Sequence, residues 1–262
     1  MSPLPSTLPG LVKARVRAAV RRPERLTPEE IESRALVLRL CSLLLQYPDA
    51  ELVDSRPELS AAAHALPSSA AAVHLAAFTS WFAGEEPEAL ERHYVERFDL
   101  RRRSGLYLTY YLHGDTRRRG TALLALNRQY RAAGWDTDRG ELPDHLPVVL
   151  EFAALTGPGA GEAPLRRHRR GVELIHRALA DDGSAYHHVL AAVLSLLPPA
   201  TEADRAAVAR LAAEGPPEEE VGLDPHGVYG AGEFAPPGSF APPGSFVPPP
   251  AESPRTEGPL SR

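Results

Sequence analysis

The stretch TPEEIESRALVLRLCSLLLQYPD, residues 27–49, has the pattern of one long amphipathic helix. Thr27 supplies an N-cap, Pro28 suits the first helical position, and Glu30 stands where a capping box needs a glutamate. Small and apolar side chains then recur at steps of three and four, at Ile31, Ala35, Leu38, Ser42 and Leu45. The helix should end before Pro48, because the residue preceding a proline disfavours the α conformation.

Similar helical patterns continue to about residue 211. Leu165, His168, Val172, Ile175 and Leu179 form the cleanest apolar stripe, and Leu90, Tyr94 and Phe98 lie four apart on another face. The segment 106–112 has a strand-like composition but no partner strand, so it is predicted to be helical. No alternating β pattern is present. We therefore predict an all-α fold, a single bundle of roughly eight helices.

Both ends of the chain differ from this central region. Residues 1–26 are basic and punctuated by proline, and residues 215–262 are rich in Pro, Gly and Glu and include FAPPGSFAPPGSF. Such compositions favour solvated, extended chains over a packed core. The predicted organisation is a disordered extension at 1–26, a helical domain at 27–214 and a disordered tail at 215–262.

The composition argues against disulfide-bonded, membrane-inserted and nucleic-acid-binding proteins. The only cysteine, Cys41, excludes an intrachain disulfide and suits a reducing compartment, so a cytoplasmic location is expected. The apolar runs are too short or too charged to cross a bilayer, so no membrane insertion is expected. The formal net charge of −5 argues mildly against nucleic-acid binding.

Known catalytic signatures are absent from the sequence. There is no phosphate-binding glycine loop and no dinucleotide fingerprint, and the lone cysteine has no second thiol for a zinc or iron-sulfur site. His187 and His188 are adjacent, so on a helix they diverge by about 100° and need outside ligands to hold a metal. No cofactor, metal site or enzymatic activity is expected.

The adjacent residues Asp144 and His145 could be either a catalytic pair or two structural residues. Adjacent side chains on a helix diverge, which disfavours a catalytic dyad. Asp144 is interpreted mainly as the cap of the helix that follows it, and His145 as a partly buried, hydrogen-bonded residue packed with Val148, Val149 and Phe152. A helical hydrolase that uses this pair remains an alternative, and it would need a nucleophile next to His145.

The triplets Arg101–Arg103 and Arg117–Arg119 favour nucleic acid more than any other segment. Three consecutive residues fan around a helix, however, so neither triplet makes a basic stripe. A solvated face, or ion pairs with Asp99, Asp115 and Glu96, is the preferred interpretation. No nucleic-acid partner is expected.

Four ordered stretches carry a family resemblance. LLLQYPDA (43–50), YVERFD (94–99), HGDTRRRG (113–120) and ELPDHLPVVLEF (141–152) resemble the respiratory nitrate reductase assembly chaperones, the NarJ or delta-subunit family of the TorD-like redox-enzyme maturation group. The resemblance covers roughly residues 27–197. Ser104-Gly105 and the proline-rich tail depart from the family pattern.

The resemblance implies an all-helical cytoplasmic chaperone. Such a protein binds the apo catalytic (alpha) subunit of a molybdenum nitrate reductase through that subunit's N-terminal segment, and keeps it competent for insertion of the molybdenum cofactor. A stable interaction subunit of an oxidoreductase complex is the alternative.

A client-binding site of two parts is expected from the residues themselves. An aromatic face would come from Tyr107, Tyr110 and Tyr111, which have helical spacing, although ordinary core packing explains each tyrosine taken singly. An acidic edge would run along the 141–152 helix. That edge comprises Glu141, Asp144, Val148 and Glu151, and His145 fixes the packing of the helix.

Overall fold

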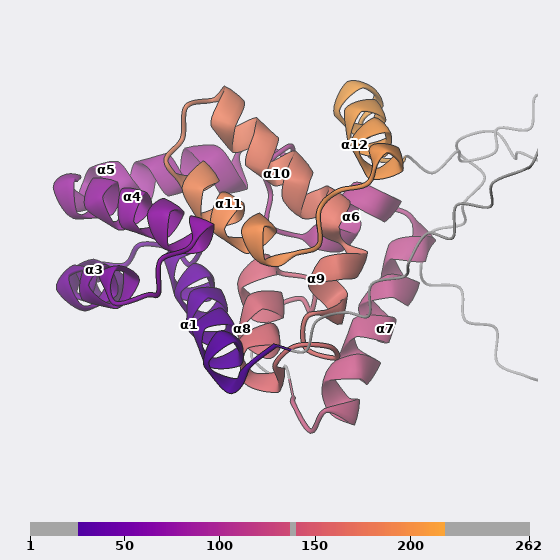
Figure 1. The fold of residues 1–262 in the computed structure, drawn as a ribbon. Helices are drawn as coiled ribbons and strands as arrows, with labels where there is room; N and C mark the ends of the chain where they lie inside the picture. The colour runs from indigo at the N-terminus through magenta and orange to yellow at the C-terminus, as the bar shows by residue number, and fades with distance from the viewer. Residues whose placement is uncertain (1–25, 137–139, 218–262) are drawn as a thin grey trace, which may run out of the picture. The chain divides into compact units, whose positions relative to one another are not determined.

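The computed structural model describes residues 26–136 and 140–217. Within these ranges the chain forms twelve α-helices and one π-helical turn, and no strand (Figure 1). The elements are α1 (Pro28–Leu44), α2 (Ala50–Asp54), α3 (Arg56–His64), α4 (Ala70–Gly84), α5 (Pro87–Tyr94), η1 (Val95–Asp99), α6 (Leu108–His113), α7 (Arg117–Ala132), α8 (Leu146–Thr156), α9 (Ala163–Arg167), α10 (Arg169–Asp181), α11 (Tyr186–Leu196) and α12 (Glu202–Glu214). The all-α prediction is confirmed.

The described helices outnumber the eight expected, in part because one predicted run is broken and one short helix was not predicted. The apolar stripe 165–179 divides at His168, which ends α9 and precedes α10 with a non-helical backbone. The helix that was not predicted is α2, which Ser55 separates from α3. Residues 1–25 and 218–262 lie outside the described residues, so the predictions of disorder at both ends stay predictions.

Helix α1 begins and ends as its sequence predicts. Thr27 accepts a hydrogen bond from the Glu30 amide at 3.2 Å, and the Glu30 carboxylate accepts one from the Thr27 amide at 2.7 Å. The helix packs against α8 and α11 (Figure 1). Arg34 adds a polar tie, because its guanidinium donates to both carboxylate oxygens of Glu162 and to the Leu196 carbonyl.

The centre of the core is aromatic. The fully buried ring of Tyr186 in α11 lies 5.0 Å from Phe78 and 4.9 Å from Phe98, measured between ring centroids. Tyr94 and Trp81 contact the same ring. Tyr186 therefore joins α11 to α4 and to the helix that continues from α5 into η1.

The η1 turn widens that helix just before Asp99. A π-helical turn contains one more residue than an α turn needs, and such turns often occur at functional sites. Tyr94 and Phe98 stay buried across the turn, as their spacing predicts, whereas Asp99 is exposed. The turn thus places a carboxylate at the surface directly beside the aromatic core.

Helix α10 contacts α6 closely because it carries Gly171. A Cβ atom added at Gly171 would lie 3.3 Å from the Tyr111 ring and 3.4 Å from the Leu108 carbonyl oxygen. These distances are tighter than most side-chain contacts, so a larger residue would push the two helices apart.

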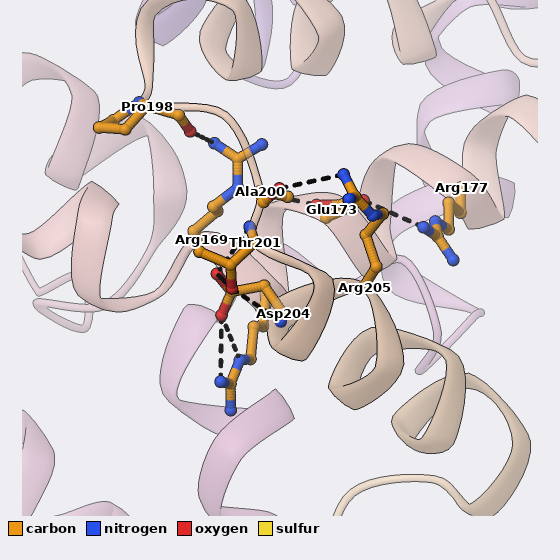
Figure 2. A network of polar contacts seen from close by, with 9 residues as sticks. Arg169, Glu173, Arg177, Pro198, Ala200, Thr201, Asp204 and Arg205 are labelled. Carbon is orange, nitrogen blue, oxygen red and sulfur yellow. Dashed lines mark hydrogen bonds and ion pairs between the residues drawn. The ribbon is translucent and has the colours of Figure 1, made fainter. Parts of the chain in front are cut away.

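Polar contacts hold α12 against α10 (Figure 2). Thr201 and Asp204 form a capping box at the start of α12. Asp204 also accepts hydrogen bonds from Nε and Nη2 of Arg170 at 3.1 and 3.0 Å. Around this pair, Arg169 donates to the Pro198 carbonyl and Arg205 to the Ala200 carbonyl. Val208, in the same helix, is buried.

Four histidines meet where α4, α10 and α11 pack. The Nδ1 atoms of His74 and His188 are 3.2 Å apart, and the rings of His187 and His188 are 3.9 Å apart. His176 completes the group, with its ring 5.9 Å from that of His187. Among the described residues, however, no set of three or more His, Cys, Asp or Glu side chains is placed to hold a metal ion.

Replacing Tyr186 should reveal how much the aromatic centre stabilises the fold. Tyr186→Ala removes a ring that four aromatic neighbours surround and should lower the free energy of unfolding by about 3–5 kcal/mol. Tyr186→Phe keeps the ring and should cost less than about 1.5 kcal/mol. Urea unfolding of both variants tests this, and similar losses in the two would contradict it.

Acidification should weaken the packing of α4, α10 and α11. Burial, followed by neighbouring imidazoles, lowers the pKa of His176, His187 and His188. The folded protein therefore binds fewer protons than the unfolded chain. The stabilising contribution of the neutral histidines is complete above the ordinary histidine pKa of about 6.5, and the free energy of unfolding falls as the pH drops below that value.

Urea unfolding at about pH 7 and about pH 5.5 measures this fall. The double variant His187→Gln/His188→Gln should lose less stability on acidification than the native chain, whereas His64→Gln, at an exposed histidine, should behave like the native chain. Equal losses in all three proteins would contradict a role for the cluster.

Candidate functional site

An antiparallel bridge joins two segments that the sequence analysis singled out. Tyr107 pairs with His145. The Leu108 amide donates to the Asp144 carbonyl at 3.0 Å, and the Leu146 amide donates to the Leu106 carbonyl at 2.8 Å. The start of α6 is therefore fixed against the start of α8.

Asp144 strengthens this junction from inside the protein. Its side chain is completely buried, and Oδ2 accepts hydrogen bonds from the amide of Thr109, at 3.1 Å, and from the Thr109 hydroxyl. Thr109 lies in the first turn of α6, so Asp144 caps α6. The prediction that it caps its own helix is wrong, because His145 takes the N-cap position of α8.

His145 is a partly buried residue at the surface of the same junction. Its ring centroid is 5.2 Å from that of Tyr107, and Nδ1 lies 3.3 Å from Oε2 of Glu141. Burial lowers the pKa of His145, although Glu141, Asp144 and Asp99 oppose the shift. Among the described residues, no hydroxyl or thiol is hydrogen-bonded to His145.

A groove of about 480 Å³ opens beside this junction. We call it the acidic groove. Its lining comes from the end of α1, from α5 and η1, from the segment before α6, from the loop after α7, and from the start of α8. The lining residues are Ser42, Gln46, Tyr47, Tyr94, Asp99, Tyr107, Trp135, Asp136, Glu141, His145, Pro147, Val148 and Glu151.

The charged side chains of the acidic groove are mainly negative. Asp99, Asp136, Glu141 and Glu151 contribute carboxylates, and no Lys or Arg is among the lining residues. The aromatic residues Tyr47, Tyr107 and Trp135 line the same groove. Such a surface fits a basic segment that also carries apolar side chains.

Five of the eight predicted site residues line the acidic groove: Tyr107, Glu141, His145, Val148 and Glu151. The predicted acidic edge along one helix is nevertheless wrong. Asp144 is buried, and Glu141 lies in the loop before α8. The acids instead converge from four separate segments.

The predicted face of three tyrosines is also wrong. Tyr107 lies before α6 with an extended backbone, so helical spacing does not apply to it. Tyr111 is a core residue whose hydroxyl donates to the Gly105 carbonyl at 2.8 Å. Both Tyr110 and Tyr111 line a different hollow, of about 570 Å³, between α6, α10 and α12.

The arginine triplets line that hollow or form ion pairs. Arg101, Arg102 and Arg103 lie along its edge, and Arg101 is paired with Asp182. Arg119 lies 3.2 Å from Asp115, one of the three partners that the sequence suggested.

Several groove residues were not assigned to a site from the sequence. Tyr47, Tyr94 and Asp99 lie in the stretches LLLQYPDA and YVERFD, which carry the family resemblance. Their place in these stretches could have marked them as candidate site residues. Trp135 and Asp136 lie in the loop after α7, and no sequence pattern pointed to them. Only the fold brings them to the groove.

Comparison with known proteins identifies the family. Residues 62–192, half of the chain, match the model named nitrate reductase delta subunit. The Bacillus subtilis protein named probable nitrate reductase molybdenum cofactor assembly chaperone NarJ is 32% identical over 164 residues, which cover 63% of this chain and 89% of that protein. The NarJ chaperone of Escherichia coli K12 is 32% identical over 173 residues, covering 65% of this chain and 73% of that protein.

A longer relative contains the same region. The nitrate reductase-like protein NarX of Mycobacterium tuberculosis is 39% identical over 166 residues, which cover 63% of this chain. The match spans about a quarter of the length of NarX. Together with the family model and the two chaperones, it shows that this chain belongs to the nitrate reductase delta subunit family.

Proposed function

We propose that this chain is a dedicated chaperone for the assembly of a molybdenum-dependent nitrate reductase and has no catalytic activity of its own. The observation that carries the proposal is the match to two assembly chaperones over most of their length. The absence of a catalytic signature from the sequence agrees with a role in binding.

The proposed partner is the catalytic (alpha) subunit before it receives its cofactor, and the proposed contact is the N-terminal segment of that subunit. The acidic groove supports this choice. Its aromatic side chains offer apolar contact, and its carboxylates would select and orient a basic segment. Tyr110 and Tyr111 are left out of the proposed contact, because they line the other hollow.

Release of the partner would need no nucleotide. A client that folds around its cofactor removes the binding-competent segment from solution, so mass action empties the groove. This mode of release favours an affinity between about micromolar and tens of nanomolar.

We further propose that the chain works in the cytoplasm, where a lone thiol stays reduced. No helix among the described residues is long and apolar enough to span a membrane. A lasting place in the reductase complex is the second candidate. It is favoured by NarX, in which the matching region is one part of a longer protein.

Affinity capture separates the two candidates. From cells that lack molybdenum cofactor, the tagged chain should retain the catalytic subunit, whereas from cofactor-replete cells it should retain much less. Mass spectrometry of the captured proteins measures the ratio. Equal recovery from both cells, together with this chain in the purified mature enzyme, would favour a permanent subunit instead.

Groove carboxylates should determine the affinity for the client segment. Asp99→Asn/Glu151→Gln removes two charges, each worth about 0.2–1 kcal/mol when exposed, so a synthetic peptide of the client N-terminal segment should bind about 2- to 30-fold more weakly. The difference should shrink at high salt. Calorimetry measures both effects.

A matched control for this experiment is Glu58→Gln/Glu214→Gln, which neutralises two exposed carboxylates outside the groove. It should bind the peptide like the native chain. Equal weakening in the two double variants would mean that only net charge matters and would remove the groove from the proposal. Asp144 is unsuitable for such a test, because its loss would disturb α6.

A further inference from the structure

The acidic groove holds carboxylates that nothing in the described fold neutralises. Glu141 contacts His145, whose pKa burial lowers. Asp99, Asp136 and Glu151 form no ion pair within the described residues. Repulsion among these acids would be relieved by a basic occupant.

The chain itself contains a segment of matching chemistry. Residues 11–22 read LVKARVRAAVRR, in which every side chain is either basic or apolar and none is acidic. The arginines of the two triplets belong to the folded domain, so they are not free to enter the groove. The tail 218–262 is predominantly acidic and has the wrong sign.

The tether between this segment and the groove has a suitable length. The groove begins at Ser42 of α1, and at 1.5 Å per residue this point lies about 21 Å along the helix from Pro28. Lys13 stands fourteen positions before Thr27. A flexible chain of that length has a mean end-to-end distance of about 20 Å and a maximal reach of about 46 Å.

We propose that residues 11–22 occupy the acidic groove of the same molecule when no other partner is bound. The basic side chains face the groove carboxylates, and the valines and alanines contact the aromatic rings. Because the segment is tethered, its effective concentration is about millimolar, and any other basic ligand must displace it. The inference uses the groove of the proposed function but does not require a nitrate reductase client.

Lys13 makes this occupancy directly measurable, because it is the only lysine in the sequence. A carbodiimide joins a carboxylate to an amine, with loss of water, only where the two are in contact. Treatment of the full chain should link Lys13 to Asp99, Asp136, Glu141 or Glu151, as identified by mass spectrometry of proteolytic fragments. The links should disappear in Lys13→Arg, whose guanidinium does not form the amide.

Other outcomes identify other occupants. Links confined to carboxylates near in sequence, such as Glu29 or Glu30, would overturn the proposal. In a mixture of isotopically heavy and light protein, links that join the two isotopes would show that a second copy supplies the segment, which would also overturn it. Failure of the client experiments leaves this measurement unaffected.

A binding experiment tests the competition without a client. A synthetic peptide of residues 11–22 should bind the full-length variant Arg15→Gln/Arg17→Gln/Arg21→Gln/Arg22→Gln at least about tenfold more tightly than the native chain, because the native groove is already filled. Adding Asp99→Asn/Glu151→Gln to that variant should abolish the gain. Equal peptide affinity for the native and arginine-substituted chains would overturn the proposal.

Discussion

The carboxylate of Asp144 is the contact on which the site depends. It lies in the interior, accepts two hydrogen bonds from Thr109, and is backed by a main-chain bond from Leu108 to its own carbonyl. Burial of a carboxylate is costly unless hydrogen bonds or charges compensate it, and the guanidinium of Arg119, 3.9 Å away, adds partial compensation. This junction holds Tyr107 and His145 side by side, and both residues line the acidic groove.

Local rules predicted the fold well where a segment determines its own structure. Thr27 caps α1 with the box that its sequence encodes, and Leu90, Tyr94 and Phe98, which were predicted to share one face, are all buried. The break at His168 and the short helix α2 were not predicted. The stripe through His168 stays apolar across the break, so periodicity alone gave no sign that the helix stops there.

The site was predicted only in part, because its residues are brought together by tertiary contacts. Asp144 was assigned to its own helix, since sequence spacing cannot show a carboxylate that bonds to an amide 35 positions away. The same limit explains the tyrosines: a bridge to His145 takes Tyr107 out of the helix in which Tyr110 and Tyr111 lie. Five groove residues were nevertheless found, because the segment 141–152 and Tyr107 meet at this bridge.

The environment of Cys41 has a practical consequence. The thiol is fully buried, its Sγ lies 3.8 Å from the Val189 carbonyl, and burial raises its pKa, so the native thiol resists alkylating reagents. Because the chain has no other cysteine, thiol alkylation reports on Cys41 alone and requires an opening of the core that exposes it. The rate at which iodoacetamide labels Cys41 therefore measures how often the core opens. No engineered probe is needed, so the measurement can be made on the native sequence in a crude extract.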